Sequence, residues 1–94
     1  MSDSLARLHA VVHGYVQGVN FRSTTQHEAA RRHLVGWVRN CWDGTVETVA
    51  EGPRSTLAEF ERYLHHGPPY AEVERVDVTY SEATGEFSGF HIRY

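Results

Sequence analysis

The sequence predicts an α+β domain in which two helices cover one face of a mostly antiparallel sheet. Several short segments alternate apolar and polar residues, as strands do, and two longer segments without this alternation each follow a strand. Glycine and proline turn signals separate the segments. The resulting order, β-α-β-β-α-β with a short extra strand at the C-terminus, is typical of the ferredoxin-like architecture, in which right-handed crossovers place both helices on one face.

The strands are predicted from alternation. In residues 7–13, Leu8, Ala10 and Val12 are expected to face the core while the residues between them face away. The pair Asp43-Gly44 predicts a hairpin turn, because glycine tolerates a positive φ and aspartate supports the turn with its side chain. The predicted strands cover residues 7–13, 37–41, 45–51, 76–80 and 90–94.

Two helices are predicted, over residues 21–33 and 54–65. The first contains no proline or glycine and several good helix formers. In the second, Thr56 and Glu59 have the spacing of a capping box, and apolar residues follow at helical spacing. A Gly-Pro-Pro sequence then ends the helix, since proline cannot continue it.

The length and composition limit the class of protein. No linker or repeat divides the 94 residues, so residues 1–94 are expected to form a single domain, with residues 1–6 flexible. The single cysteine excludes an intramolecular disulfide bond. Because no signal region and no apolar run of roughly 20 residues occurs, we expect a cytoplasmic protein without membrane contact, acting as a monomer.

The charged residues narrow the possible partners further. The net charge of −3 provides no general basic field, which argues against a nucleic-acid partner. All nine basic residues are arginine, so chemistry that depends on lysine, including the nucleotide-binding P-loop, is excluded. A bound phosphate must therefore be held by arginine, whose planar fork suits phosphate oxygens, by backbone N–H groups, or by both.

The segment from Gly14 to Arg22 is predicted to be an anion-binding loop, here called the cradle. It connects the first strand to the first helix, where the N–H groups of the first helical turn have no internal partners and the helix dipole favours negative charge. The glycines Gly14 and Gly18 let the backbone curl so that successive N–H groups converge on one anion. Arg22 lies in the first helical turn, from which its guanidinium can reach back over the loop. A plain strand-to-helix connection with a solvated arginine is the alternative interpretation.

Asn40 is a second candidate, near the end of the second strand and before the hairpin. Its amide carries both an acceptor and a donor, so it can hold a water molecule without itself titrating. A role in supporting the neighbouring turn is the alternative interpretation.

Both segments resemble signatures of the acylphosphatase family. Residues 14–22 read GYVQGVNFR, similar to the family pattern G-x-V-Q-G-V-x-F-R. Residues 36–47 read GWVRNCWDGTVE, similar to its companion G-W-V-R-N-x-x-D-G-x-V-E. The resemblance runs from about Leu8 to Tyr94 and includes further short matches at Thr25-Gln26, Glu51-Gly52-Pro53, Gly67-Pro68-Pro69 and the closing residues 90–94.

The resemblance implies hydrolysis of the carboxyl–phosphate bond of small-molecule acyl phosphates to a carboxylate and inorganic phosphate, which also acts as an inhibitor. It implies that Arg22 binds the phosphoryl oxygens and that Asn40 positions the attacking water. Cradle residues whose backbone N–H groups would share in this binding are Tyr15, Val16, Gln17, Gly18, Val19, Asn20 and Phe21. Because the transition state is loose and rich in charge and the leaving carboxylate is stable, the reaction needs no metal, cofactor or covalent intermediate. Ser23 and Thr24 stand where many family members carry a bulkier side chain.

Other residues with reactive side chains are interpreted as structural. A cysteine phosphatase needs an arginine six positions after its thiolate, and here Glu47 follows Cys41 at that distance. Asp43 lacks the second aspartate of an aspartyl-phosphate enzyme and is assigned to the turn. The seven histidines show no compact spacing for metal ligands, so no metal is expected. Aromatic residues such as Trp37 could stack on bases, but without a basic surface an RNA-binding sheet is disfavoured.

Two function classes remain. The first is an enzyme, an acylphosphatase with Arg22 and Asn40 as the essential pair. The second is a binding module on the same fold, which would use the cradle to sense phosphate or an anionic metabolite without turnover.

Overall fold

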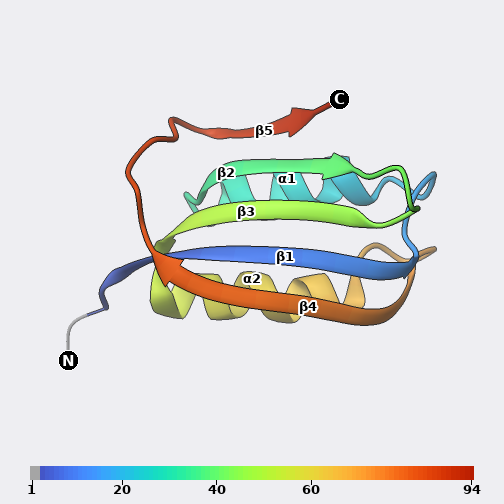
Figure 1. The fold of residues 1–94 in the computed structure, drawn as a ribbon, viewed down its shortest axis with the longest axis horizontal. Coiled ribbons are helices and arrows are strands. Elements are labelled where there is room, and N and C mark those ends of the chain that lie inside the picture. The colour runs from blue at the N-terminus through green and yellow to red at the C-terminus, as the bar shows by residue number, and fades with distance from the viewer. Residues whose placement is uncertain (1–2) are drawn as a thin grey trace.

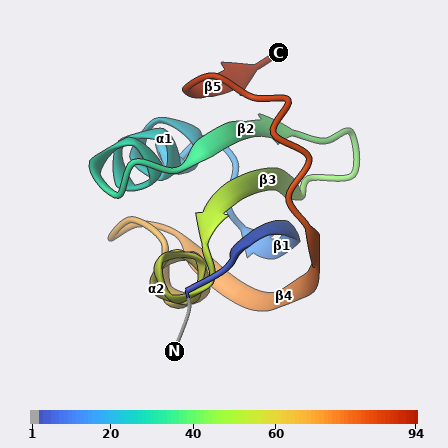
Figure 2. The ribbon, with the colours of Figure 1, turned by 90° about the vertical axis from the view of Figure 1, so that its left-hand side faces the viewer.

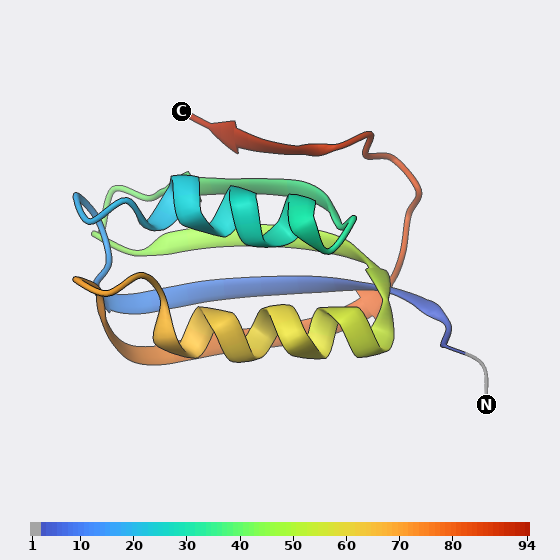
Figure 3. The same ribbon diagram turned by 180° about the vertical axis from the view of Figure 1, so that it is seen from behind.

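The computed structural model describes residues 3–94, which form one five-stranded sheet with both helices on the same face (Figure 1). Seen from behind, α1 and α2 lie side by side across the sheet (Figure 3). The elements in chain order are β1 (Leu5–Tyr15), α1 (Phe21–Arg31), β2 (Val35–Asn40), β3 (Val46–Pro53), α2 (Arg54–His66), β4 (Glu72–Glu82) and β5 (Phe90–Arg93).

The strands are ordered β4-β1-β3-β2-β5 across the sheet. β1 pairs antiparallel with both β3 and β4, and β2 pairs antiparallel with β3, whereas β5 adds to the edge parallel to β2. Viewed end on, both helices lie to one side of the curved sheet (Figure 2). This arrangement confirms the predicted ferredoxin-like fold with its short additional strand.

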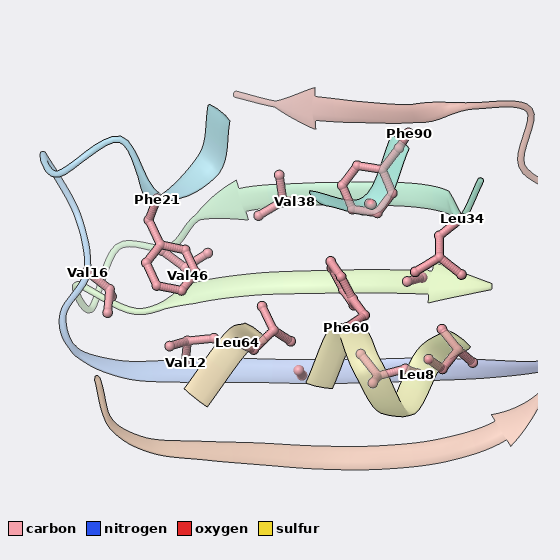
Figure 4. Close-up of a cluster of buried hydrophobic side chains, with 14 of the residues drawn as sticks. Leu8, Val12, Val16, Phe21, Leu34, Val38, Val46, Phe60, Leu64 and Phe90 are labelled. Atoms are coloured by element: carbon pink, nitrogen blue, oxygen red, sulfur yellow. The ribbon is translucent and has the colours of Figure 1, made fainter. Parts of the chain in front are cut away.

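The core lies between the sheet and the helices, and β1 shows how the sequence produces it. Leu8, Ala10 and Val12 are fully buried, as their alternation predicts. Figure 4 shows β1 side chains meeting Phe60 and Leu64 of α2. Burial of apolar side chains of this size contributes about 1.5–3 kcal/mol each relative to exposure.

Helix α1 is shorter than predicted, ending at Arg31 rather than at residue 33. His33 adopts a left-handed backbone conformation, with φ of 59°, which cannot continue the helix. The N–H of Leu34 then donates to the carbonyl of Ala29 at 2.9 Å, closing the turn and directing the chain into β2.

The N-terminal segment is expected to be flexible over residues 1–6. Strand β1 already begins at Leu5. Asp3 is held by Ser55, whose backbone N–H and hydroxyl donate to the Asp3 carboxylate at 3.0 and 2.5 Å. Leu5 and the residue after it therefore lie in a strand, while the flexibility expected for residues 1–6 stays a prediction, and residues 1–2 lie outside the described part of the chain.

Helix α2 begins at Arg54, as predicted, but the way its first turn is capped differs from the prediction. No capping box forms at Thr56 and Glu59, because the helix begins three residues earlier than that motif requires, with Pro53 at its N-cap and no side-chain cap there. The carboxylate of Asp3 accepts from the first helical turn instead. A residue distant in sequence thus does what the local motif was expected to do.

Candidate active site

A cavity of about 280 Å³ opens at the end of the sheet where β1 leads into α1, on the right in Figure 1. It brings together both predicted catalytic residues, Arg22 at the start of α1 and Asn40 at the end of β2. The complete lining is Val16, Gly18, Asn20, Phe21, Arg22, Ser23, Asn40, Ile92 and Tyr94. The predicted association of the cradle with Asn40 is therefore present in the structure.

The cradle begins with a sharp change of direction at Gly14. The pairing of β1 with β4 shifts register between His13 and Gly14, and Gly14 has a φ of 130°. A Cβ atom here would lie 2.1 Å from the carbonyl oxygen of Glu72, so only glycine fits. The chain leaves the sheet at this point and turns toward the helix.

The rest of the cradle curls through two left-handed residues, Gly18 with φ of 76° and Asn20 with φ of 64°. Asn20 is the N-cap of α1, yet its side chain makes no capping hydrogen bond. Within residues 3–94, the backbone N–H groups of residues 16–21 donate no hydrogen bond in any loop, turn or cap. These donors, together with the positive end of the α1 dipole, are available to an anion.

The seven predicted cradle residues do not all border the cavity. Val16, Gly18, Asn20 and Phe21 line it, whereas Tyr15, Gln17 and Val19 do not. Tyr15 is still part of β1, opposite Glu72, so the run of free N–H groups starts one residue later. Val16 and Phe21 also point their side chains into the core, which anchors both ends of the curl (Figure 4).

Arg22 carries a positive charge that has no counter-ion. Among residues 3–94 its guanidinium makes neither a salt bridge nor a hydrogen bond, while Arg7 and Arg32 are each paired with carboxylates. The guanidinium carbon lies over the ring of Tyr94, 5.0 Å from the ring centre. No aspartate or glutamate is among the residues that line the cavity, so this half-buried arginine is suited to hold an anion.

Asn40 is the last residue of β2 and lies on the helix-facing side of the strand, as does buried Val38. In the described part of the chain its side-chain amide has no hydrogen-bond partner, so it is available to a water molecule or a substrate. Arg39 points to the opposite face, as predicted, where it donates to Glu47 at 2.7 Å.

Gln17 has a role that the sequence interpretation missed. Its side-chain Nε2 donates to the carbonyls of Cys41 at 2.8 Å and Thr45 at 2.9 Å, and so ties the cradle to the hairpin between β2 and β3. The sequence does contain a signal for this role. Gln17 is the one long polar side chain between Tyr15 and Asn20, and such a residue in a glycine-rich loop commonly satisfies backbone groups.

Ile92 and Tyr94 were also missed as parts of the site. They reach the cavity because β5 pairs parallel with β2, with Val38 opposite Ile92 and Arg39 opposite Arg93. Local sequence carries no signal for this register. Ser23, one of the two small residues noted in the sequence, lines the cavity as well, but Thr24 does not.

The hairpin residues have the structural roles predicted for them. Asp43 accepts hydrogen bonds from the Thr45 hydroxyl at 2.6 Å and the Thr45 backbone N–H at 3.1 Å, and these bonds lower the pKa of Asp43. Cys41 is half-buried, with its sulfur 4.0 Å from a carboxylate oxygen of Glu47. The residue six positions after the thiol is this glutamate, whereas a cysteine phosphatase needs an arginine there, so the arrangement differs from that of a cysteine phosphatase.

The histidines in the sheet form pairs rather than clusters. His9 contacts Glu47 at 2.7 Å and His13 contacts Asp77 at 2.9 Å, both on the face of the sheet without helices. Over residues 3–94 there is no group of three or more His, Cys, Asp or Glu side chains that could hold a metal ion. Neither helix of the described chain is long and apolar enough to cross a membrane.

Comparison with known proteins identifies what this chain is similar to. A family model described as acylphosphatase matches residues 8–92. An acylphosphatase from Pelotomaculum thermopropionicum is 50% identical over 91 residues, which cover 97% of this chain and 99% of the relative. An acylphosphatase from Dehalococcoides mccartyi is 48% identical over 88 residues, covering 93% and 97%. The crystal structure of an acylphosphatase from Bacillus subtilis superimposes with a TM-score of 0.91 at 40% identity, over 95% of this chain and 99% of that one.

Proposed function

The chain belongs to the acylphosphatase family, and we propose that it hydrolyses acyl phosphates by direct attack of water on a phosphoryl group held in the cradle. The observation that carries this mechanism is the shared cavity. Judged over residues 3–94, it places an arginine without a counter-ion, a run of free backbone N–H groups and an unpartnered asparagine amide around one space. We further propose that the enzyme acts as a monomer, because one chain supplies Arg22, Asn40 and the cradle, and that it works in the cytoplasm.

The phosphoryl group is held by charge and by hydrogen bonds. The guanidinium of Arg22 donates to two phosphoryl oxygens, and the cradle N–H groups donate to the remaining oxygen lone pairs. These donors are fixed before the substrate arrives, so they stabilise the charge that develops in the transition state without reorganising. Phosphoryl transfer depends mainly on this kind of positioning and electrostatic stabilisation.

Asn40 supplies the water. Its side-chain oxygen accepts a hydrogen bond from a water molecule and aims the water oxygen at phosphorus. The water oxygen forms the new P–O bond while the bond from phosphorus to the acyl oxygen breaks, and the acyl group leaves as a carboxylate. The proton of the water passes to a phosphoryl oxygen. The products are a carboxylate and inorganic phosphate, which can occupy the same cradle and so inhibit the enzyme.

A sensor that binds phosphate without turnover is the competing function. It would use Arg22 and the cradle in the same way, but it would have no need of an amide positioned for water. The unpartnered side chain of Asn40 beside the same cavity favours the enzyme.

The decisive experiment measures hydrolysis of benzoyl phosphate by the purified protein in the presence of a chelator, with inorganic phosphate as a competitive inhibitor. Arg22→Ala should weaken phosphate binding by about 100-fold, because a charge-assisted fork is lost. Asn40→Ala should lower kcat by about 10²–10³-fold with phosphate binding little changed. Arg62→Ala removes an exposed arginine of α2 outside the cavity and serves as the matched control.

The outcomes separate the two functions. Phosphate binding without turnover by the unmodified protein would leave only the sensor. Unchanged hydrolysis in both the Arg22→Ala and Asn40→Ala variants would show that the site residues are wrongly assigned. Loss of activity with the chelator would contradict the metal-independent mechanism.

A further inference from the structure

Within residues 3–94, the guanidinium of Arg22 has one cation–π partner, the ring of Tyr94. The two groups come from opposite ends of the chain, one from the first turn of α1 and the other from the residue after β5. The guanidinium carbon lies over the Tyr94 ring at 5.0 Å from its centre, within the range of a cation–π interaction. Both residues line the same cavity.

An aromatic ring holds an arginine differently from a carboxylate. A carboxylate binds the N–H donors at the edge of the guanidinium and neutralises its charge, as Glu47 does to Arg39. A ring contacts the face of the guanidinium and leaves its five in-plane N–H donors and its full charge available. A ring is therefore the kind of partner that can order a phosphate-binding arginine without competing with the phosphate.

Strand β5, which leads to Tyr94, is held to both β2 and α1. The N–H of Gly36 donates to the carbonyl of Gly89 at 2.9 Å, and Gln26 donates to the carbonyl of Phe90 at 3.2 Å. Gln26 lies one turn after Arg22 on α1, so the helix that carries the arginine also holds the strand that carries the ring.

We propose that Tyr94 is a positioning residue that orders the Arg22 guanidinium above the cradle before the phosphoryl group binds. This inference rests on the proposed role of Arg22 as the phosphoryl ligand. Without the ring, the long arginine side chain would sample several rotamers before the phosphate binds. Ordering it on binding would cost conformational entropy and so weaken the phosphate affinity. The inference makes the face of the ring, and not the tyrosine hydroxyl, the important feature.

The test uses inorganic phosphate as the probe, because phosphate has no acyl group that could itself contact the ring. Its dissociation constant is measured by calorimetry for the unmodified protein and for Tyr94→Phe, Tyr94→Trp and Tyr94→Leu. Tyr94→Leu should weaken phosphate binding about two- to fivefold, while the Phe and Trp variants should bind as the unmodified protein does. Tyr70→Leu removes an exposed tyrosine that is outside the cavity, and it should change nothing.

Kinetics with two substrates provide a second measurement. Tyr94→Leu should raise KM by the same factor for acetyl phosphate and for benzoyl phosphate, with kcat changed by less than about twofold. A rise confined to benzoyl phosphate would overturn the inference, because the ring would then be contacting the acyl group. Unchanged phosphate binding in Tyr94→Leu, or failure of Tyr94→Phe to match the unmodified protein, would also overturn it.

The failure of this inference and the failure of the proposed function are distinguishable. If the unmodified protein binds phosphate but hydrolyses neither substrate, the proposed function is wrong, yet the order of phosphate affinities among the variants still tests Tyr94. Because Tyr94 is exposed, its replacement leaves the core intact, and a melting temperature for each variant verifies this.

Discussion

The side-chain amide nitrogen of Gln17 donates to the backbone carbonyl of Cys41 at 2.8 Å and also to the backbone carbonyl of Thr45. These two hydrogen bonds connect the cradle to the hairpin next to Asn40. In the proposed mechanism, this contact would set the distance between the cradle, which would hold the phosphoryl group, and Asn40, which would position the water. The other observed constraint on the cradle is the burial of Val16 and Phe21 at its two ends, since within residues 3–94 the N–H groups between them donate no hydrogen bond in the loop.

We therefore expect Gln17→Ala to impair both stability and catalysis. Two hydrogen bonds are lost, which should lower the free energy of unfolding by about 1–2 kcal/mol, and the loosened cradle should raise KM for benzoyl phosphate more than it lowers kcat. Urea unfolding and steady-state kinetics measure the two effects. A KM equal to that of the unmodified protein would show that the cradle keeps its shape without this contact.

Substitution of two glycines separates backbone strain from obstruction of the site. Gly18 and Gly44 both have a positive φ, and a Cβ atom at either would meet no other atom within 4 Å. Gly18→Ala and Gly44→Ala should each lower the free energy of unfolding by about 1 kcal/mol, because alanine resists this backbone conformation. Only Gly18 lines the cavity, so only Gly18→Ala should also raise KM, by about tenfold or more. Equal KM values for both variants would contradict the location of the phosphoryl group beside Gly18.

Replacement of Arg22 by lysine tests whether the charge alone is sufficient. Lysine keeps the positive charge but loses the planar fork, so phosphate should bind at least about tenfold more weakly to Arg22→Lys. The melting temperature should not change, since Arg22 has no salt bridge in the described chain. Arg62→Lys is the matched control. Normal phosphate affinity in Arg22→Lys would show that a point charge is enough.

The stability of the fold should depend on the ionisation of Glu51. Burial alone would raise the pKa of this carboxyl group. Hydrogen bonds from Thr84 and from the N–H of Gly85, together with the nearby charge of Arg7, outweigh this effect and hold the pKa below its ordinary value of 4.5. A lowered pKa contributes stability that is complete above the unfolded-state pKa and is lost as the pH falls through the folded-state pKa.

We accordingly expect Glu51→Gln to lower the free energy of unfolding by about 1–3 kcal/mol at pH 7, because the donors of Thr84 and Gly85 lose a charged acceptor that is itself buried. The difference from the unmodified protein should shrink as the pH falls from about 4.5 toward 3, where Glu51 itself becomes protonated. Urea unfolding at a series of pH values measures this, with Glu82→Gln as a control at an exposed glutamate of β4. A difference that stays constant with pH would contradict the lowered pKa.

The sequence was sufficient to predict the fold and the proximity of Arg22 and Asn40 around one cavity, while their catalytic roles stay predictions. Alternation identified the core face of β1, and the glycines at 14 and 18 together with Arg22 marked the strand-to-helix loop. Asn40 could be placed because it stands immediately before a recognisable hairpin. These features are determined by residues close to one another in the chain.

The features that the sequence did not reveal depend on contacts between distant segments. Asp3 serves the first turn of α2, and Tyr94 reaches Arg22, only because the strands pair in one particular register. Register follows from the summed packing of the whole sheet and has no local signature when it joins a short parallel edge strand. Gln17 is the exception, since a polar residue in a glycine-rich loop was a visible signal.

The parallel pairing of β5 with β2 has a consequence for how activity appears during folding. The cradle and Asn40 can form once the three central strands and α1 have come together, but the ring of Tyr94 arrives only when the last residues of the chain add to the sheet edge. Strand β5 pairs at the edge of the sheet through only a few residues, and chain ends of this kind are the least firmly held parts of a domain, so this pairing is expected to form late. Recovery of full phosphate affinity after refolding should therefore lag behind the burial of the core, so that binding reports the final step of assembly.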